Sequence, residues 1–260
     1  MTGRRSARTM ALGLLLALSV PAAGAAQDAA ADPLPEAGTE LELGRYVSSL
    51  VGPTIDFRAD EDWIVGLSGD GPIFTLEYLP APGAVLSVTR FDGETFLDSC
   101  DPSSMTLVES TVPRLTEIIA GNPYLNASPV EAVSVDGYEG FQVDVGVPSY
   151  DPTECALPYV LVWAIPVGEG GEFVQMADQQ SRFLLIDVDG DVVVIAIETV
   201  PGVPFGGFLE AAMDLVESMN IEPGEYIPPE QTSEPEPEPT SAPSAMPSPS
   251  PAPSPAVDPA

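Results

Sequence analysis

Short runs of aliphatic, aromatic and threonine residues recur through the middle of the chain, separated by clusters of Gly, Pro and Asp. Such spacing is typical of β-strands joined by turns. It predicts strands over residues 54–57, 63–67, 73–78, 84–90 and 159–165. The last run is continuously apolar, which predicts a central strand that is buried on both faces.

Two further pairs of runs are joined by an Asp-Gly dipeptide, a strong signal for a β-hairpin with a type I′ turn. The dipeptides and their flanking runs are Asp136-Gly137 between 130–135 and 138–147, and Asp189-Gly190 between 183–188 and 192–197. In the strand 138–147, Phe and Val alternate with polar residues and Gly, so one face of that strand is expected to be buried and the other exposed to solvent.

In two other segments, the apolar residues recur with the 3.6-residue period of an α-helix. The first is expected to begin after a capping Ser110 or Thr111, with Pro113 in its first turn and Gly121 just past its end. The residues predicted for its core face are Leu115, Ile118 and Ile119. The second helix covers about residues 205–219, and its apolar stripe consists of Phe208, Leu209, Ala212, Met213, Leu215, Val216 and Met219.

Hairpins with two packing helices predict an α+β domain, in which a twisted antiparallel sheet of about 6–9 strands carries the two helices. A β-sandwich is the alternative. The pattern assigns residues 41–227 to this domain and residues 27–40 to a flexible lead-in. Residues 228–260 are acidic and proline-rich without any aromatic residue. They cannot bury enough apolar surface to offset the conformational entropy lost on folding, so they are expected to form a disordered tail.

The first 26 residues have the three zones of a signal peptide. Arg4, Arg5 and Arg8 precede an apolar run over 10–20, and small residues follow around Ala25. A run of this length is too short to span a bilayer, which takes about 20 residues. With no cysteine at the cleavage site for lipid attachment, we expect a protein that is secreted into the extracellular space or the cell envelope.

Cys100 and Cys155 are the two cysteines of the chain. In an oxidising compartment such a pair usually forms a disulfide. The sequence has no Cys-x-x-Cys motif and no lysine or histidine that would lower a thiol pKa, so a structural bond is expected rather than a redox site.

The overall pattern resembles secreted bacterial proteins with a Mog1/PsbP-like α/β/α sandwich. The resemblance rests on Trp63 ahead of a strand meander, on the hairpin sequence 133–138, and on the closing helix over 208–221. It implies a twisted antiparallel sheet with helices on both faces. It also implies a non-enzymatic binding or assembly module, and it supplies no catalytic motif to carry onto this chain.

Charge and composition exclude several classes of function. Acidic residues outnumber basic ones 40 to 8, for a net charge of −32. Such a charge repels phosphate backbones and anionic headgroups, so neither nucleic acid nor an anionic membrane surface is an expected partner. Without histidine or lysine, the chain cannot form a Ser-His-Asp triad, a His-ligated zinc site or a Schiff base.

Two acidic motifs remain as candidates for chemistry. Asp187, Asp189 and Asp191 resemble the start of a calcium loop, although a hairpin turn explains the same residues. The acids of 60–62 precede Trp63, and paired carboxylates beside an aromatic ring suit glycosidic cleavage, although solvated loop acids are the simpler interpretation. Apart from that calcium candidate, no cofactor, metal or catalytic residue is expected.

The leading hypothesis is therefore an exported, non-enzymatic module that binds a cell-wall polymer, a small ligand or a partner protein. The alternatives are a carboxylate-dependent hydrolase acting on glycans and an acidic envelope protein that serves salt tolerance. A ligand face is expected to use aromatic side chains, and the candidates are Tyr46, Tyr124, Tyr138, Tyr150, Tyr159, Trp163 and Phe173.

Overall fold

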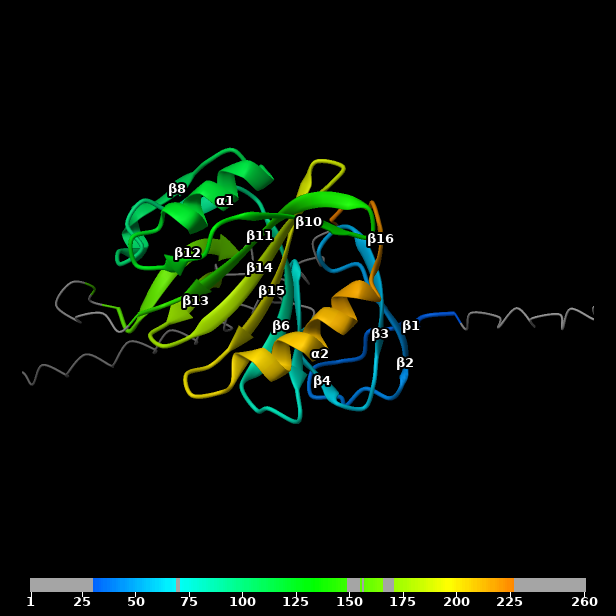
Figure 1. Ribbon diagram of the computed structural model, residues 1–260. Coiled ribbons are helices and arrows are strands. Elements are labelled where there is room, and N and C mark those ends of the chain that lie inside the picture. The colour runs from blue at the N-terminus through cyan, green and yellow to red at the C-terminus, as the bar shows by residue number, and fades with distance from the viewer. Residues whose placement is uncertain (1–29, 69–70, 149–154, 156, 166–170, 227–260) are drawn as a thin grey trace, which may run out of the picture. The chain divides into compact units, whose positions relative to one another are not determined.

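The chain is organised around a central sheet of eight strands (Figure 1). The computed structural model describes residues 30–68, 71–148, 155, 157–165 and 171–226. The strand order is β10-β11-β14-β15-β6-β5-β4, with β9 paired to β11, and every pairing is antiparallel. The strands are β4 (Trp63–Ser68), β5 (Ile73–Tyr78), β6 (Ala84–Phe91), β9 (Asn126–Ala127), β10 (Glu131–Val135), β11 (Tyr138–Gly146), β14 (Gln180–Val188) and β15 (Asp191–Thr199).

Both expected hairpins are confirmed. The turn residues Asp136 and Gly137 have φ of 49° and 84°, and Asp189 and Gly190 have φ of 55° and 100°. A type I′ turn requires positive φ at both central positions, which Asp tolerates and Gly adopts without steric cost. The two Asp-Gly dipeptides therefore set the register of β10 with β11 and of β14 with β15.

The two central strands bury both of their faces. In β14, Leu184 and Ile186 point into one apolar core, while Phe183 and Leu185 point into another. Successive side chains of a strand face opposite sides of the sheet, so a fully apolar strand serves two cores at once.

On one face, α2 (Phe205–Glu217) packs against β15, β6 and β3 (Figure 1). Its apolar stripe is confirmed, since Phe208, Ala212, Leu215 and Val216 are buried. A small sheet, ordered β1-β2-β3-β16, closes this side. Its strands are β1 (Asp32–Pro33), β2 (Gly44–Ser48), β3 (Thr54–Ala59) and β16 (Asn220–Glu222).

On the opposite face, α1 (Val112–Gly121) packs against β11 and β14. A third sheet, ordered β13-β12-β7-β8, lies on the same side, and in it Trp163 stacks on Phe173 with ring centroids 4.0 Å apart. Its strands are β7 (Glu94–Phe96), β8 (Met105–Leu107), β12 (Tyr159–Ile165) and β13 (Gly171–Met176), with the short helix η1 (Pro102–Ser104) ahead of β8.

The α+β prediction is confirmed, with eight strands in the central sheet and a helix on each face. The alternative of a purely β-sandwich is wrong, because helices cover part of both faces. The two outer sheets were not predicted. No helix in the part of the chain that the structure describes is long and apolar enough to cross a membrane.

One boundary needs correction. Part of the expected flexible lead-in is bound to the domain: Leu34 donates to the carbonyl of Val47, and Gly38 donates to that of Val65. The strand β1 has only two residues and contains a proline, so the sequence pattern could not reveal it. The expected signal peptide (1–26) and the expected tail (228–260) lie outside the described residues.

Candidate functional site

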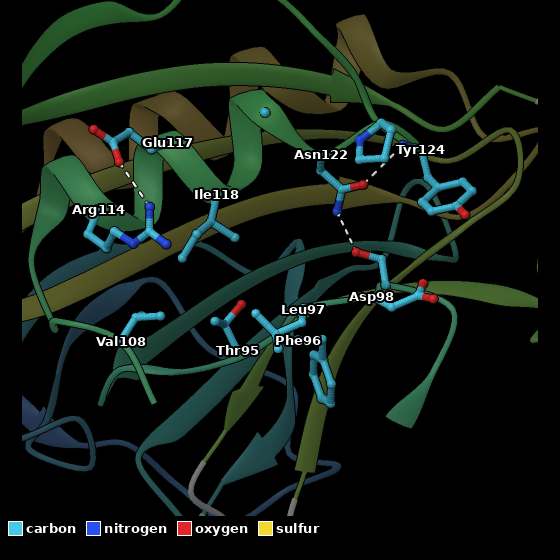
Figure 2. A pocket seen from close by; sticks show the side chains of 13 residues that line it. Thr95, Phe96, Leu97, Asp98, Val108, Arg114, Glu117, Ile118, Asn122 and Tyr124 are labelled. Carbon is cyan, nitrogen blue, oxygen red and sulfur yellow. Dashed lines mark hydrogen bonds and ion pairs between the residues drawn. The ribbon is translucent and has the colours of Figure 1, made fainter. Parts of the chain in front are cut away.

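A pocket of about 510 Å³ lies between α1 and the segment that begins with β7 (Figure 2). We call it the α1–β7 pocket. Figure 2 shows Arg114 and Ile118 pointing from the helix toward β7. The lining residues are Thr95, Phe96, Leu97, Asp98, Ser99, Val108, Arg114, Glu117, Ile118, Gly121, Asn122, Pro123 and Tyr124. This volume lies within the range of small-molecule sites.

The helix wall follows directly from the sequence. The Thr111 side chain accepts a hydrogen bond from the amide of Arg114, so Thr111 is the cap, and Pro113 lies in the first turn. Leu115 and Ile119 are fully buried beneath the helix. Ile118, which was expected in the core, is only half-buried and lines the pocket instead.

The opposite wall is held by buried polar contacts. The Asn122 side-chain amide donates to the Ser99 hydroxyl at 2.8 Å, and the Ser99 carbonyl accepts from the amide of Leu161. The Thr95 hydroxyl donates to the carbonyl of Val162. Because these groups are buried, losing one partner would leave the other unsatisfied, and this keeps the wall in one geometry.

A disulfide holds the end of this wall. Cys100 and Cys155 are bonded, as expected, and join positions 55 residues apart in the sequence. Cys100 follows Ser99 of the pocket lining directly. A bond of this kind is compatible with an extracellular or envelope location.

The charged groups of the pocket are accessible to water. Arg114 and Glu117 form an ion pair at 3.0 Å, with side chains that are 44% and 69% exposed. Exposed pairs of this type contribute about 0–1 kcal/mol. Asp98 lies on the other wall and accepts the amide of Cys100. The carboxylates of this pocket can therefore accept hydrogen bonds from a ligand, but neither is sequestered from water as a general acid requires.

A second polar cluster lies farther along the same face of the central sheet. Glu198 accepts hydrogen bonds from the side chains of Gln175, Gln179 and Ser181, with Gln175 as the closest donor at 2.5 Å. Burial raises the pKa of Glu198 from 4.5 to about 7, and these hydrogen bonds partly offset the rise. The cluster connects β13 to β14 and β15. Nothing in the sequence pattern indicated it, because Glu198 lies near the end of a strongly apolar strand.

The expected calcium residues occupy a hairpin turn. The carboxylate of Asp187 accepts the amide of Gly190 at 2.7 Å, and Asp191 forms an ion pair with Arg90 at 3.3 Å. Within the described ranges, no group of three or more acidic, Cys or His side chains is placed to hold a metal ion. The hairpin accounts for this run, and calcium binding stays a prediction.

The acids near Trp63 border a different cavity, of about 440 Å³. Asp60 lines it together with Trp63, Tyr78 and Asp214. Burial, and then the charges of Asp62 and Asp60, raise the pKa of Tyr78. Glu198, the carboxyl group with the raised pKa, is not among the residues that line this cavity. Glycan hydrolysis stays a prediction.

The aromatic candidates separate into core and site residues. Trp163 and Phe173 are buried, and Tyr46 packs on Phe57 in the α2-side core. Tyr124 lines the α1–β7 pocket. Tyr150 lies outside the described residues.

No family model matches the chain, and no curated protein matches it. Among solved structures, the PsbP protein of Synechocystis sp. PCC 6803 (CyanoP) is similar at 14% identity and a TM-score of 0.35, over 72% of this chain and 98% of that one. The protein LpqN of Mycobacterium tuberculosis, involved in cell envelope biogenesis, is similar at 17% identity and a TM-score of 0.31, over 66% and 86%.

A Bacteroides thetaiotaomicron protein is similar at 7% identity and a TM-score of 0.34; the match covers 64% of this chain but only 44% of that protein. The likeness to PsbP-like proteins is weak. At these TM-scores it assigns no function.

Proposed function

We propose that this chain is an exported, non-enzymatic binding module, and that its ligand occupies the α1–β7 pocket. The observation that carries the proposal is a pocket of about 510 Å³ whose wall is fixed by buried hydrogen bonds and whose end is held by a disulfide. When the side chains of a cavity are already held in place, binding loses little free energy to ordering them.

The side chains of the pocket favour a neutral or cationic ligand with both apolar faces and hydroxyl groups. Ile118 and Tyr124 offer apolar surface, while Asp98 offers a carboxylate that accepts hydrogen bonds. The net charge of −32 disfavours anionic ligands. Among the expected partners, these features suit a saccharide unit of a cell-wall polymer best.

The test is retention of the full chain on purified cell-wall polysaccharide, followed by titration with soluble fragments of the same polymer. We expect retention, and we expect Ile118→Gln and Arg114→Gln to weaken fragment binding about tenfold or more, because both side chains line the pocket on the exposed side of α1. Leu43→Gln is the matched control, since Leu43 is exposed and lines the other cavity.

Two results would contradict the proposal. Absence of retention on any wall fraction would refute the ligand class. Equal binding by the wild type and both pocket variants, with their melting temperatures unchanged, would show that the ligand binds elsewhere.

A further inference from the structure

The hairpin of β7 and β8 exposes three large apolar side chains. Leu97, Met105 and Leu107 are 81%, 54% and 74% exposed. Leu97 lines the α1–β7 pocket, whereas Met105 and Leu107 alternate along β8 and share one face of the hairpin. Single exposed apolar residues are ordinary, but two neighbours on one strand face mark a surface that a partner can cover. We call Met105 and Leu107 the hairpin patch.

The same hairpin ends the third sheet with an open edge. In the order β13-β12-β7-β8, the strand β8 has a partner on one side only among the described residues. The amide of Val108 donates to the carbonyl of Gly93, and the amide of Leu97 donates to the carbonyl of Ser104. In an antiparallel pair, hydrogen-bonded and non-hydrogen-bonded residue pairs alternate, so these two bonds show which pairs between β7 and β8 are bonded.

Leu107 lies opposite Glu94, and Met105 lies opposite Phe96. Both are non-hydrogen-bonded pairs, so the main-chain groups of Leu107 and Met105 do not bond to β7. The N–H and C=O of Leu107 and the C=O of Met105 therefore point away from β7, toward the open edge. Side chains of paired residues lie on the same face of a sheet, so Met105 and Leu107 share a face with Phe96. Phe96 packs there against Leu161 and Ala164.

Acidic residues surround the edge. Glu94 lies beside Leu107 on the neighbouring strand, Asp101 precedes β8, and Glu109 follows it. Hydrogen bonds from the side chain and the amide of Ser103 lower the pKa of Asp101, which keeps it ionised. Among the described residues, neither Asp101 nor Glu109 forms an ion pair, whereas Arg90 and Arg114 pair with other acids.

We propose that the open edge of β8 binds an extended polypeptide segment of a partner protein, with alternating apolar residues and with lysine or arginine at its ends. The segment adds a strand to β8, its alternate side chains contact the hairpin patch, and its basic ends face the acids at both ends of β8. Main-chain hydrogen bonds supply affinity and side-chain contacts supply specificity in this mode.

Charge argues against the other occupants. A second copy of this chain would bring a net charge of −32 against an acidic edge. The chain's own residues 228–260 repeat glutamate and proline, and proline has no N–H to donate to the edge. This surface is separate from the ligand of the α1–β7 pocket, so either proposal can fail without the other.

The test uses the full chain and a fluorescent peptide in which valine and threonine alternate between two lysine pairs. We expect saturable binding at low salt that weakens as salt screens the charges. The same core between glutamate pairs should bind at least about tenfold more weakly, and so should a lysine-flanked peptide with alternate amides methylated.

Variants then locate the site. Leu107→Glu and Leu107→Pro should each weaken binding about tenfold or more, because the first removes an apolar contact and the second removes an outward N–H that β7 does not use. Leu43→Glu is the matched control, since Leu43 is 77% exposed and distant in sequence, and it should bind as the wild type does. Ile118→Gln, in the pocket, should also leave peptide binding unchanged.

Four results would overturn the proposal: no binding of the lysine-flanked peptide, equal binding of the glutamate-flanked one, insensitivity to methylated amides, or equal losses from Leu107→Glu and Leu43→Glu. A concentration-dependent dimer of the full chain that Leu107→Glu dissociates would also overturn it, in favour of a second copy. If Leu107→Pro fails to fold, Leu107→Glu and the methylated peptide still decide the outcome.

Discussion

The two faces of the central sheet are covered in different ways. On the α2 side, the strands pack against one helix and the small sheet of β2 and β3 around a core of aliphatic and aromatic side chains. On the α1 side lie the disulfide and the three buried amide side chains of the described residues, Asn122, Gln175 and Gln179, and Glu198 of β15 faces this side from the central sheet. The same strands therefore build one core that is mainly apolar and another that also carries buried polar contacts, including those in the wall of the α1–β7 pocket.

The largest expected effect tests the covalent part of this difference. Replacing both Cys100 and Cys155 by serine should lower the free energy of unfolding by about 4 kcal/mol, because the bond closes a loop of 55 residues in the unfolded chain. Urea unfolding measures the loss, and the wild type under full reduction is the control that should match the double variant. A loss below about 1 kcal/mol would show that the α1 side does not depend on the disulfide.

The next effect asks whether the two faces contribute equally to stability. Leu184 and Leu185 are neighbours in β14, both are fully buried, and they point to opposite faces. Replacing either by alanine should cost about 3 kcal/mol, from lost burial and from the cavity left behind. Chemical unfolding of the two variants measures both costs. A small cost for Leu185→Ala alone would mean that the α1 side is loosely packed.

The sequence predicted the central sheet well, for a physical reason. Long apolar runs and two Asp-Gly turns determine β10, β11, β14 and β15 locally, and the stripe of α2 follows from its helical period. Each of these signals needs only neighbouring residues. Pairing partners did not have to be known.

The candidate site was less predictable, because it depends on long-range pairing. Strands β7 and β8 have three residues each, too few for a periodic signal, and β7 is placed by pairing with β12 at Trp163. Ile118 lies on the apolar face that the helical period predicts, yet it lines the pocket. The period shows which side chains share a face of the helix, but it does not show which of them another segment of the chain will cover. The cluster around Glu198 joins residues from three strands and the turn before β14, and only tertiary packing brings it together.

A third prediction concerns the pH dependence of the α1 side. The folded pKa of Glu198 is about 7, above the unfolded value of 4.5, so between these pH values the folded state binds more protons than the unfolded state. Its contribution to stability is therefore present at low pH and lost as pH rises through 7. With partial solvent access taken into account, the difference amounts to about 2 kcal/mol.

Glu198→Gln should remove this dependence, because a neutral amide replaces the ionising group. Unfolding measured at pH 5, 6, 7 and 8 should show the variant gaining on the wild type as pH rises. Glu210→Gln, on the exposed side of α2, is the control for losing one negative charge. Parallel pH profiles for the wild type and Glu198→Gln would mean that Glu198 does not titrate in this range.

The smallest expected effect concerns a difference between α1 and α2 in how their N-termini are capped. The first turn of α1 is capped by the Thr111 side chain, whereas α2 begins after Pro204 without a side-chain cap. Thr111→Ala should cost about 1 kcal/mol and Thr111→Ser should recover most of it, because serine restores the hydroxyl acceptor. Hydrogen exchange at the amide of Arg114 should accelerate in the alanine variant, since that amide donates to Thr111.

Ser110→Ala is the informative comparison, because the sequence alone left Ser110 and Thr111 as equal candidates for the cap. The Ser110 hydroxyl donates to the carbonyl of Phe91 instead, so its loss should leave exchange at Arg114 unchanged. Since Arg114 lies in this first turn and lines the α1–β7 pocket, Thr111→Ala should also weaken binding of the proposed pocket ligand. An equal acceleration of exchange in both alanine variants would mean that the start of α1 is held by its packing rather than by its cap.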